Sequence, residues 1–346
     1  MNQPLARTLL QIVALSAVPF TLAFAQTTGK LPAEKAGEID RPQGRIAFIR
    51  DGNIWAMDAG GANPMMVCEA TNADGRLSWS PDDKKIVFTR RGQVDVQGPD
   101  GGGGRHRLYD LFLASLDSAY ANKPQFWFPL TGDVGNRYPE WTADPKVILF
   151  YKDVNANRVN AGEPNYQLAT VEYDEKTTQP QAGYVKVLRD DWESAGDALL
   201  IMPTMGPNGE IACVAMYQQK PQGLLVLEKD EYQLPLDSIK ARSRQNLNCV
   251  APAFSHDGKW IAYVNNNLND GSLYIMTPDF KERYQVFSPP APTALYTVAP
   301  SFSPDSKWIT FSTNDGSIWI TPITGEGAQR LTGPGSDKFP AWSKTP

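Results

Sequence analysis

A short stretch rich in acidic and amide side chains offers the clearest metal-binding pattern in the chain. Asp153, Asn155 and Asn157 place side-chain oxygens at alternate positions, and Glu163 follows nearby. Calcium binds oxygen ligands, and EF-hand loops carry them at alternate positions. The stretch lacks a mid-loop Gly, and Glu163 stands one position early for an EF-hand. It therefore allows two interpretations, a calcium site or a solvated loop stiffened by Asx turns.

The His, Ser and Gly residues of the chain do not form a recognisable catalytic motif. His106 and His256 are the only two His, too few for a His-rich metal centre in one chain. His256 lies in a Ser-His-Asp-Gly sequence, which favours a turn residue over a ligand. No Gly-x-Ser-x-Gly elbow is present, which argues against a serine hydrolase. Gly101–Gly104 lacks the Gly-Lys-Ser/Thr of a phosphate loop and favours a flexible loop. We therefore expect no catalytic residues.

Charge and Cys content narrow the range of partners. The chain carries 38 Asp and Glu against 33 Lys and Arg, a formal net charge of −5, which disfavours nucleic acid. Cys68, Cys213 and Cys249 are an odd number, so at least one thiol is unpaired within the monomer. In an oxidising compartment Cys213 and Cys249 could form a bridge; the alternative for each Cys is a small buried apolar residue.

The N-terminal segment predicts export. Residues 1–25 contain Arg7, an apolar stretch from Leu9 to Phe24 and a final Ala-Phe-Ala, which is the layout of a secretory signal peptide. The apolar stretch is shorter than the roughly 20 residues of a spanning helix, which favours cleavage over a retained anchor. Residues 26–44 are expected to be a polar linker. We therefore expect a periplasmic protein of a Gram-negative-type bacterium, without a membrane span of its own if the signal peptide is cleaved.

A repeated β-structure must position these residues. An apolar or aromatic pair near Ser, a Pro-Asp or Asp-Gly turn and a β-branched strand recur most clearly in residues 77–88, 251–263 and 299–311. Weaker copies start at Tyr138 and Met202. Such turns are hairpin chemistry, because Pro sets the backbone of the turn and Asp caps it locally. Each copy reads as four short strands, which is the composition of a propeller blade.

The repeats predict an all-β, six-bladed propeller over residues 45–346. The anchor residue of the first strand recurs six times, at Trp79, Trp141, Met205, Phe254, Phe302 and Trp342. The chain enters the repeat at a second strand, 45–50, and ends on a first strand, 339–343. We therefore expect the C-terminal strand to complete one four-stranded antiparallel blade with the N-terminal strands, which would also cover their edges.

These residues resemble the TolB-like propeller family, whose WD40-like repeat is also called PD40. Arg50–Asp58, Pro300–Asp305 and Gln329–Thr332 carry the likeness, which extends over residues 45–343. The resemblance implies a six-bladed periplasmic propeller that binds partner proteins of the cell envelope. TolB itself has an α/β domain before its propeller, whereas here only residues 26–44 follow the expected signal peptide. The resemblance thus covers the propeller, a fold that hosts many activities.

Loop lengths suggest where a partner binds. Turns between first and second strands are short, whereas the connections from second to third strands, 91–107 and 153–166, are long, as are those between blades. The long connections emerge on one face, and loops on a rigid scaffold commonly carry binding residues. Arg and Trp are enriched at interface hot spots. We therefore predict partner contacts by Arg105, Arg107, Asp153, Arg158, Trp192, Arg242 and Arg244.

Two functional hypotheses remain. The favoured one is a non-enzymatic periplasmic scaffold that binds envelope proteins, as an accessory or structural subunit of a membrane assembly. The alternative is a carbohydrate or small-molecule binder, or a lyase-type enzyme, that uses the central channel. We expect no cofactor apart from the calcium considered for Asp153, Asn155 and Asn157.

Overall fold

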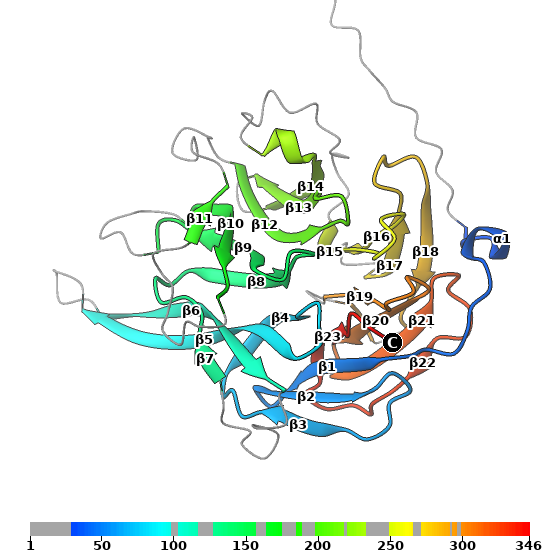
Figure 1. Ribbon diagram of the computed structural model, residues 1–346, viewed down its shortest axis with the longest axis horizontal. Helices are drawn as coiled ribbons and strands as arrows, with labels where there is room; N and C mark the ends of the chain where they lie inside the picture. Colours follow the sequence, from blue (N-terminus) through cyan, green and yellow to red (C-terminus); the bar gives the residue numbers. More distant parts are fainter. Residues whose placement is uncertain are drawn as a thin grey trace, which may run out of the picture.

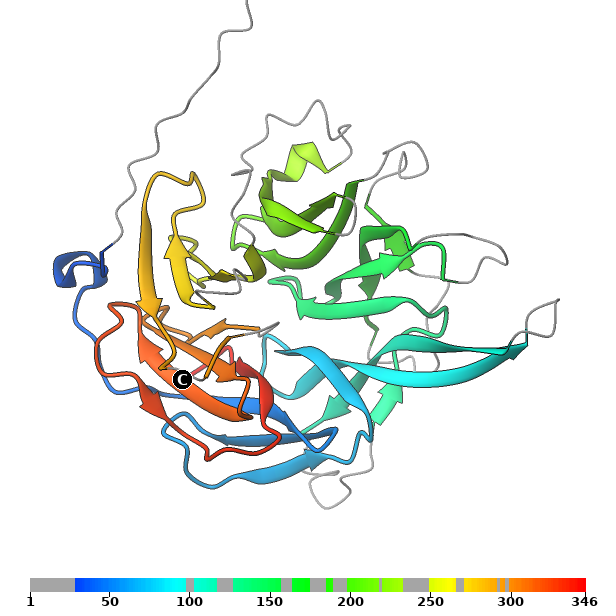
Figure 2. The same ribbon diagram turned by 180° about the vertical axis from the view of Figure 1, so that it is seen from behind.

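Six antiparallel β-sheets surround a central axis like the blades of a propeller (Figure 1). The computed structural model describes residues 29–97, 103–116, 127–156, 164–174, 185–188, 198–217, 220–232, 249–265, 271–290, 293–295 and 299–346. The view from behind shows the same ring of sheets (Figure 2). The predicted all-β, six-bladed propeller is confirmed.

Blades 1 to 3 follow one another along the chain. Blade 1 consists of β4 (Ala73–Trp79), β5 (Lys85–Gln97), β6 (Gly103–Ser115) and β7 (Trp127–Pro129). Blade 2 consists of β8 (Asn136–Trp141), β9 (Val147–Asp153), β10 (Tyr166–Glu172) and β11 (Val185–Val187). In blade 3 the described residues form β12 (Ala198–Met205), β13 (Ile211–Tyr217) and β14 (Lys220–Leu227), followed by the 3-10 turn η2 (Lys229–Glu231).

Blades 4 to 6 complete the ring. Blade 4 consists of β15 (Cys249–Phe254), β16 (Ile261–Asn265), β17 (Leu273–Met276) and β18 (Arg283–Phe287). Blade 5 consists of β19 (Ser301–Phe302), β20 (Trp308–Thr313), β21 (Ser317–Pro322) and β22 (Gln329–Arg330). Blade 6 combines β23 (Lys338–Trp342) with β1 (Arg45–Arg50), β2 (Asn53–Asp58) and β3 (Met65–Cys68).

The pairing of β23 with β1 joins the two ends of the propeller. The strands run antiparallel, with Ile46 opposite Trp342 and Ala47 opposite Ala341. Just beyond the paired residues, the backbone N–H of Ser343 donates to the carbonyl of Arg45 at 2.8 Å. The indole of Trp79 in blade 1 donates to the carbonyl of Ala341 at 2.9 Å. The last strand is therefore bonded both within blade 6 and to blade 1.

The apolar faces of neighbouring blades supply the core. Each pair of adjacent blades shares a cluster of buried residues. Phe88 of blade 1 packs in the cluster between blades 1 and 6, and Phe48 of blade 6 packs in the cluster between blades 5 and 6. The anchors Trp79 and Trp342 are almost completely buried. This is the face-to-face packing that alternating strands require. Cys68, Cys213 and Cys249 are free thiols buried in these clusters, so the expected small apolar role is confirmed and the Cys213–Cys249 bridge is not formed.

The short turns use the predicted side-chain chemistry. In blade 4, Ser255 Oγ donates to Asp257 Oδ1 at 2.7 Å, and the same carboxylate accepts the N–H of Lys259 at 3.1 Å. Blades 1 and 5 repeat the arrangement with Asp82 and Asp305. Serine hydroxyls also accept the first N–H after the turn, which fixes the entry of the second strand.

Bulges in the first strands bend the chain beside the central axis. In β8, the paired residues Arg137 and Glu140 enclose Tyr138 and Pro139, while their partners on β9 are separated by one residue. Single extra residues of this kind also occur in β12, β15 and β23. In β4, Gly75 and Arg76 lie opposite no residue, because the partners of Asp74 and Leu77 are consecutive. Bulges re-aim side chains, and the larger bulge of β4 brings Arg76 to the axis.

Two segments lie outside the ring. The strands β5 and β6 form a long hairpin that projects from blade 1 (Figure 1), so much of the expected loop 91–107 is strand instead. The short helix α1 (Ala33–Ala36) lies at the periphery beside blade 4, where Lys35 Nζ forms an ion pair with Glu282 at 2.7 Å. Among the described residues, no helix is long and apolar enough to cross a membrane. The segment 1–25 lies outside the described residues.

Candidate functional site

The central channel opens into a cavity on the face that carries the short turns. Its volume is about 210 Å³, and all six blades contribute to its wall. The six anchor residues of the first strands line it: Trp79, Trp141, Met205, Phe254, Phe302 and Trp342. Because the anchors pack between the blades, the same side chains that hold the fold together supply the apolar part of a wall that also carries polar groups. We call this cavity the short-turn mouth.

Arg76 closes the inner end of the short-turn mouth. Its guanidinium lies 2.7 Å from Glu140 Oε2, donates to the carbonyl of Pro203 at 2.7 Å and also donates to the carbonyl of Pro252. The side chain is almost fully buried, and its far side rests on the ring of Tyr138, 5.2 Å from the ring centroid. A buried charge is tolerated when it is paired and hydrogen-bonded. Arg76 therefore ties blades 1 to 4 together at the axis.

Both carboxylate oxygens of Glu140 already have partners within the protein. Glu140 Oε1 accepts the hydroxyl of Thr204 at 3.0 Å and the N–H of Met205 at 2.9 Å. The other oxygen holds Arg76. The Arg76–Glu140 pair is thus electrically balanced and satisfied, and it serves as the floor of the mouth.

Lys344 adds a positive charge at this mouth. The segment that carries it is held by Asp83, whose carboxylate accepts the N–H of Lys344 at 2.7 Å and the N–H of Thr345 at 2.8 Å. Burial lowers the pKa of the half-buried Lys344 side chain. Within the described part of the chain, no hydrogen bond or ion pair engages its Nζ. Its ammonium group is available to an anion that enters the mouth.

His256 contributes a neutral imidazole to the same cavity. Its Nδ1 lies 3.0 Å from the carbonyl of Ser303, and because a carbonyl only accepts, Nδ1 carries the proton. Nε2 is then an acceptor, and it is buried with no partner in the described protein. Burial, followed by the charge of Lys344, lowers the pKa of His256 from 6.5 to about 4. The mouth therefore combines an apolar wall, an ammonium donor and a neutral acceptor.

Sequence reasoning placed the partner site on the opposite face, and most of those residues lie outside the described parts of the chain. This applies to Arg158, Trp192, Arg242 and Arg244. Arg105 and Arg107 lie on β6 opposite Asp95 and Gln93, rather than in the loop expected there, and the structure does not describe their side chains. The structure does not bring these residues together into a described site, and they remain a proposal.

The predicted calcium ligands are only partly described. Asp153 Oδ1 accepts the N–H groups of Asn155 and Asn165, both at 3.0 Å, which is an Asx turn closing the loop. Asn157 lies outside the described residues. In the described part of the chain, no three His, Cys, Asp or Glu side chains gather as metal ligands.

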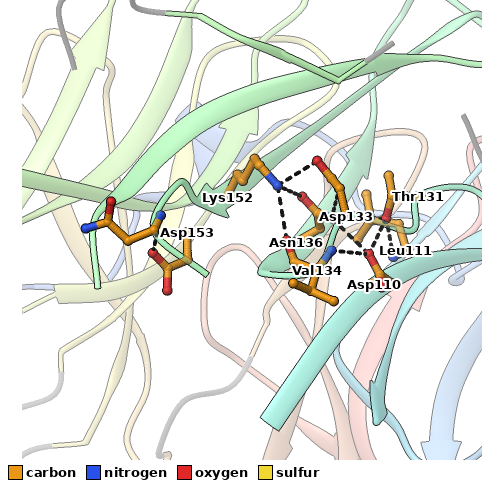
Figure 3. Close-up of polar contacts among 9 residues, drawn as sticks. Asp110, Leu111, Thr131, Asp133, Val134, Asn136, Lys152 and Asp153 are labelled. Carbon is orange, nitrogen blue, oxygen red and sulfur yellow. Dashed lines mark hydrogen bonds and ion pairs between the residues drawn. The ribbon is translucent and has the colours of Figure 1, made fainter. Parts of the chain in front are cut away.

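A polar network beside Asp153 is satisfied internally (Figure 3). Asp110 Oδ1 accepts the hydroxyl of Thr131, the N–H of Val134 and the amide of Asn136 at 2.9 to 3.1 Å. Lys152 Nζ lies 2.8 Å from Asp133 Oδ2 and also donates to the carbonyl of Val134. Each charge has an internal partner, so this network anchors the connection between blades 1 and 2.

The sequence analysis missed the residues of the short-turn mouth. In the first blade, Leu77 stands where the other first strands carry Pro two residues before the anchor, and Arg76 directly precedes it, so the interrupted repeat was the available signal. Lys344 occupies the place of Pro81 and Pro304 in the turn repeat, at the final incomplete copy. Both departures fall on residues that line the channel.

Comparisons with known proteins agree on the fold. No protein-family model and no curated protein sequence matches the chain. TolB from Acinetobacter baumannii has a similar structure, with 19% identity and a TM-score of 0.60 over 86% of this chain and 66% of that chain. A structure assigned as TolB from Agrobacterium tumefaciens has 12% identity and a TM-score of 0.56, covering 89% of this chain and 94% of its own.

A chain of the nidogen/laminin complex is also similar, with 10% identity and a TM-score of 0.57 over 87% of this chain and 99% of that chain. At these identities the likeness shows the fold alone. The chain spans slightly less than two thirds of the A. baumannii TolB chain.

Proposed function

We propose that this chain is a periplasmic protein-binding scaffold that holds an acidic segment of an envelope protein in the short-turn mouth. The observation that carries the proposal is the Lys344 ammonium, which has no partner in the described protein and faces a cavity walled by six apolar anchors. An acidic side chain would pair with Lys344, and apolar neighbours in the same segment would contact the anchors. Periplasmic residence rests on the signal peptide expected in residues 1–25.

The likeness to TolB structures supports this proposal at the level of the scaffold. A ring with a preformed concave mouth needs no large rearrangement to bind a peptide segment, so its ordering cost is small. The Arg76–Glu140 floor is electrically balanced and His256 is neutral at pH 7, so Lys344 sets the sign of the mouth. Binding should weaken as salt rises to the extent that it depends on the Lys344 charge.

The test compares envelope proteins recovered by immobilised full chain and by two variants. Lys344→Met removes the charge in the mouth, and Lys259→Met removes a matched charge from another short turn, where Lys259 is largely exposed. We expect a dominant partner to be retained by the wild type and by Lys259→Met, and to be lost from Lys344→Met. Equal recovery by all three proteins would show that the mouth does not bind the partner.

The long-connection face has its own test. Replacing Arg105, Arg107 and Trp192 with Ala leaves the short-turn mouth unchanged. If that triple variant loses the partner while Lys344→Met keeps it, the binding site is on the long-connection face, as the sequence alone predicts. The two outcomes are mutually exclusive for a partner with one contact site.

A second candidate function is eliminative cleavage of an acidic carbohydrate in the same mouth. The specific observation is the neutral His256 imidazole, whose unpartnered Nε2 could accept a proton, together with Lys344, which could neutralise a substrate carboxylate. A survey of polyuronates for the ultraviolet absorbance of unsaturated products tests it. Activity that disappears in His256→Gln would support the enzyme, and absence of product would leave the scaffold.

A further inference from the structure

A second cavity lies on the other side of Arg76 and Tyr138, at the opposite end of the channel. Its volume is about 240 Å³, and Tyr109, Arg137, Tyr138, Tyr151 and Phe339 form most of its wall. It shares no lining residue with the short-turn mouth. We call it the tyrosine cavity.

Arg137 lies in the tyrosine cavity without an acidic partner. Its guanidinium carbon is 3.6 Å from the centroid of the Tyr109 ring and 5.9 Å from that of Tyr166. No ion pair of Arg137 is found within the described ranges, and its Nε is buried with no hydrogen-bond partner there. Arginines held away from water are normally paired with carboxylates or phosphates. The stacked ring of Tyr109 and a hydrogen bond to the Tyr151 side chain hold this guanidinium in place, while Nε has no partner among the described residues.

Tyr138 adds a second unused donor. The side chain is 6% exposed, and its hydroxyl is buried with no partner among the described residues. Burial raises its pKa to about 12, so the phenol keeps its proton at physiological pH. Burial also raises the pKa of the neighbouring Tyr151, which stays protonated too. A buried hydroxyl without a partner carries a desolvation cost that a bound acceptor would remove.

The two unpartnered polar groups of the cavity wall are therefore both hydrogen-bond donors. Arg137 and Tyr138 both offer hydrogens, and a ligand that satisfies them must supply acceptor oxygens. The one carboxylate in the wall, Asp74, has a cation of its own, because Lys338 Nζ lies 3.6 Å from Asp74 Oδ1. Asp74 is thus paired with Lys338, and no ion pair joins a carboxylate of the wall to Arg137 among the described residues.

We infer that the tyrosine cavity binds a small organic carboxylate. One carboxylate oxygen accepts from Arg137 and the other from the Tyr138 hydroxyl, a charge-assisted arrangement that fixes the ligand's orientation. The rings of Tyr109, Tyr151 and Phe339 contact the organic body. The volume equals that of on the order of eight water molecules at roughly 30 Å³ each, which admits a six-membered ring with one carboxylate group.

An organic acid fits this cavity better than inorganic phosphate. Phosphate presents acceptors in every direction and needs several donors around it. Here only two unpartnered donors, Arg137 Nε and the Tyr138 hydroxyl, belong to the wall, and aromatic residues form much of its remainder. Small-molecule sites are commonly built in this way, with a largely apolar lining and a few placed polar groups.

The test is calorimetric titration of the full chain with four probes, namely benzoate, D-glucuronate, D-glucose and inorganic phosphate. We expect saturable binding of benzoate or D-glucuronate and no saturable binding of D-glucose or phosphate. Saturable binding by phosphate alone would overturn the organic part of the inference. Binding of glucose as strong as that of glucuronate would overturn the role of the carboxylate.

Two variants assign the binding to the cavity. Arg137→Gln should weaken carboxylate binding at least tenfold, and Tyr138→Phe should weaken it several-fold. Arg283→Gln is the matched control, because Arg283 also lies on a tyrosine ring, 4.1 Å from the centroid of Tyr274, with an unpartnered Nε, but does not line the cavity. It should bind the acids like the wild type. Undiminished affinity in Arg137→Gln would refute the site.

A stability measurement separates a ligand site from a structural one. Without ligand, Tyr138→Phe should melt at the same temperature as the wild type or higher, because it removes a buried hydroxyl that has no protein partner. With saturating benzoate or D-glucuronate, the wild type should gain more in melting temperature than Tyr138→Phe. If none of the four probes binds, the donors serve internal water alone and the inference fails.

Discussion

His256 should make the propeller sensitive to mild acid. Its imidazole donates through Nδ1 to the carbonyl of Ser303 and buries Nε2 at the short-turn mouth. Burial and the nearby charge of Lys344 lower its pKa from 6.5 to about 4. The folded protein therefore takes up a proton on His256 less readily than the unfolded chain. A group of this kind contributes its full stability above pH 6.5 and loses it as the pH falls towards 4.

The magnitude follows from the two pKa values. Each unit of pKa difference corresponds to about 1.4 kcal/mol, so protonation of His256 should lower the free energy of unfolding by about 3 kcal/mol in total between pH 6.5 and pH 4. Most of that loss is complete by pH 5, where the free energy of unfolding should lie about 2 kcal/mol below its value at pH 7 on account of this one residue. Carboxylates contribute little over this interval, because most of them titrate below it.

Urea denaturation followed by tryptophan fluorescence at pH 7 and pH 5 measures the effect. Wild type and His256→Gln should differ in pH dependence by about 2 kcal/mol, because Gln cannot titrate. His106 is present in both proteins, so its contribution cancels. Lys344→Met should show an intermediate slope, because removing the neighbouring charge raises the pKa of His256. The same loss of stability in wild type and His256→Gln would refute the assignment of a buried neutral imidazole.

Four further outcomes can be checked by thermal or urea denaturation. Asp83→Ala should cost about 3 kcal/mol, because it leaves several hydrogen bonds of the C-terminal segment unmade, whereas Asp144→Ala in the blade 2 turn should cost less than about 1 kcal/mol. A chain ending at Lys338 should melt well below the full chain, since it lacks most of β23; an unchanged melting temperature would contradict the role of this strand in blade 6. Gly316→Ala should destabilise by more than about 1 kcal/mol, because Gly316 has a φ of +73° and an added Cβ would fall 1.9 Å from the carbonyl oxygen of Gly335. Calcium added to the stripped protein should change neither heat nor melting temperature, because Asp153 already closes its own loop; saturable heat would restore the calcium hypothesis.

Repetition made the fold predictable from the sequence. Blades 1, 4 and 5 reuse one turn, and a Ser hydroxyl and an Asp carboxylate close it in the same way at Ser80, Ser255 and Ser303. The anchors recur because every blade must present a large apolar side chain to its neighbours. Local turn chemistry and the packing requirement therefore indicate the same fold. A fold can be predicted from sequence when local preferences and core packing agree in this way.

The candidate site was not predictable in the same way. Arg76, Glu140 and Lys344 come from three blades and meet only after the ring closes, so no spacing along the chain reports their proximity. The bulge that brings Arg76 inward depends on how β4 pairs with β5, which the sequence pattern does not specify. Predictions of binding residues from loop length favoured the long connections, whereas the short-turn mouth is built from first strands and short turns.

The position of Arg76 and Tyr138 decides how the two ends of the channel relate. The guanidinium of Arg76 stacks on the ring of Tyr138 and is bonded to blades 2, 3 and 4, so the pair separates two cavities that share no lining residue. A ligand in one cavity cannot reach the other without displacing a buried, fully paired charge, which is strongly unfavourable. The free-energy effects of mutations at two sites that share no contact partners normally add. Removing the Lys344 charge should therefore change partner binding and leave carboxylate binding at Arg137 unaltered, whereas a shift in both would mean that the Arg76–Tyr138 pair moves when either end is occupied.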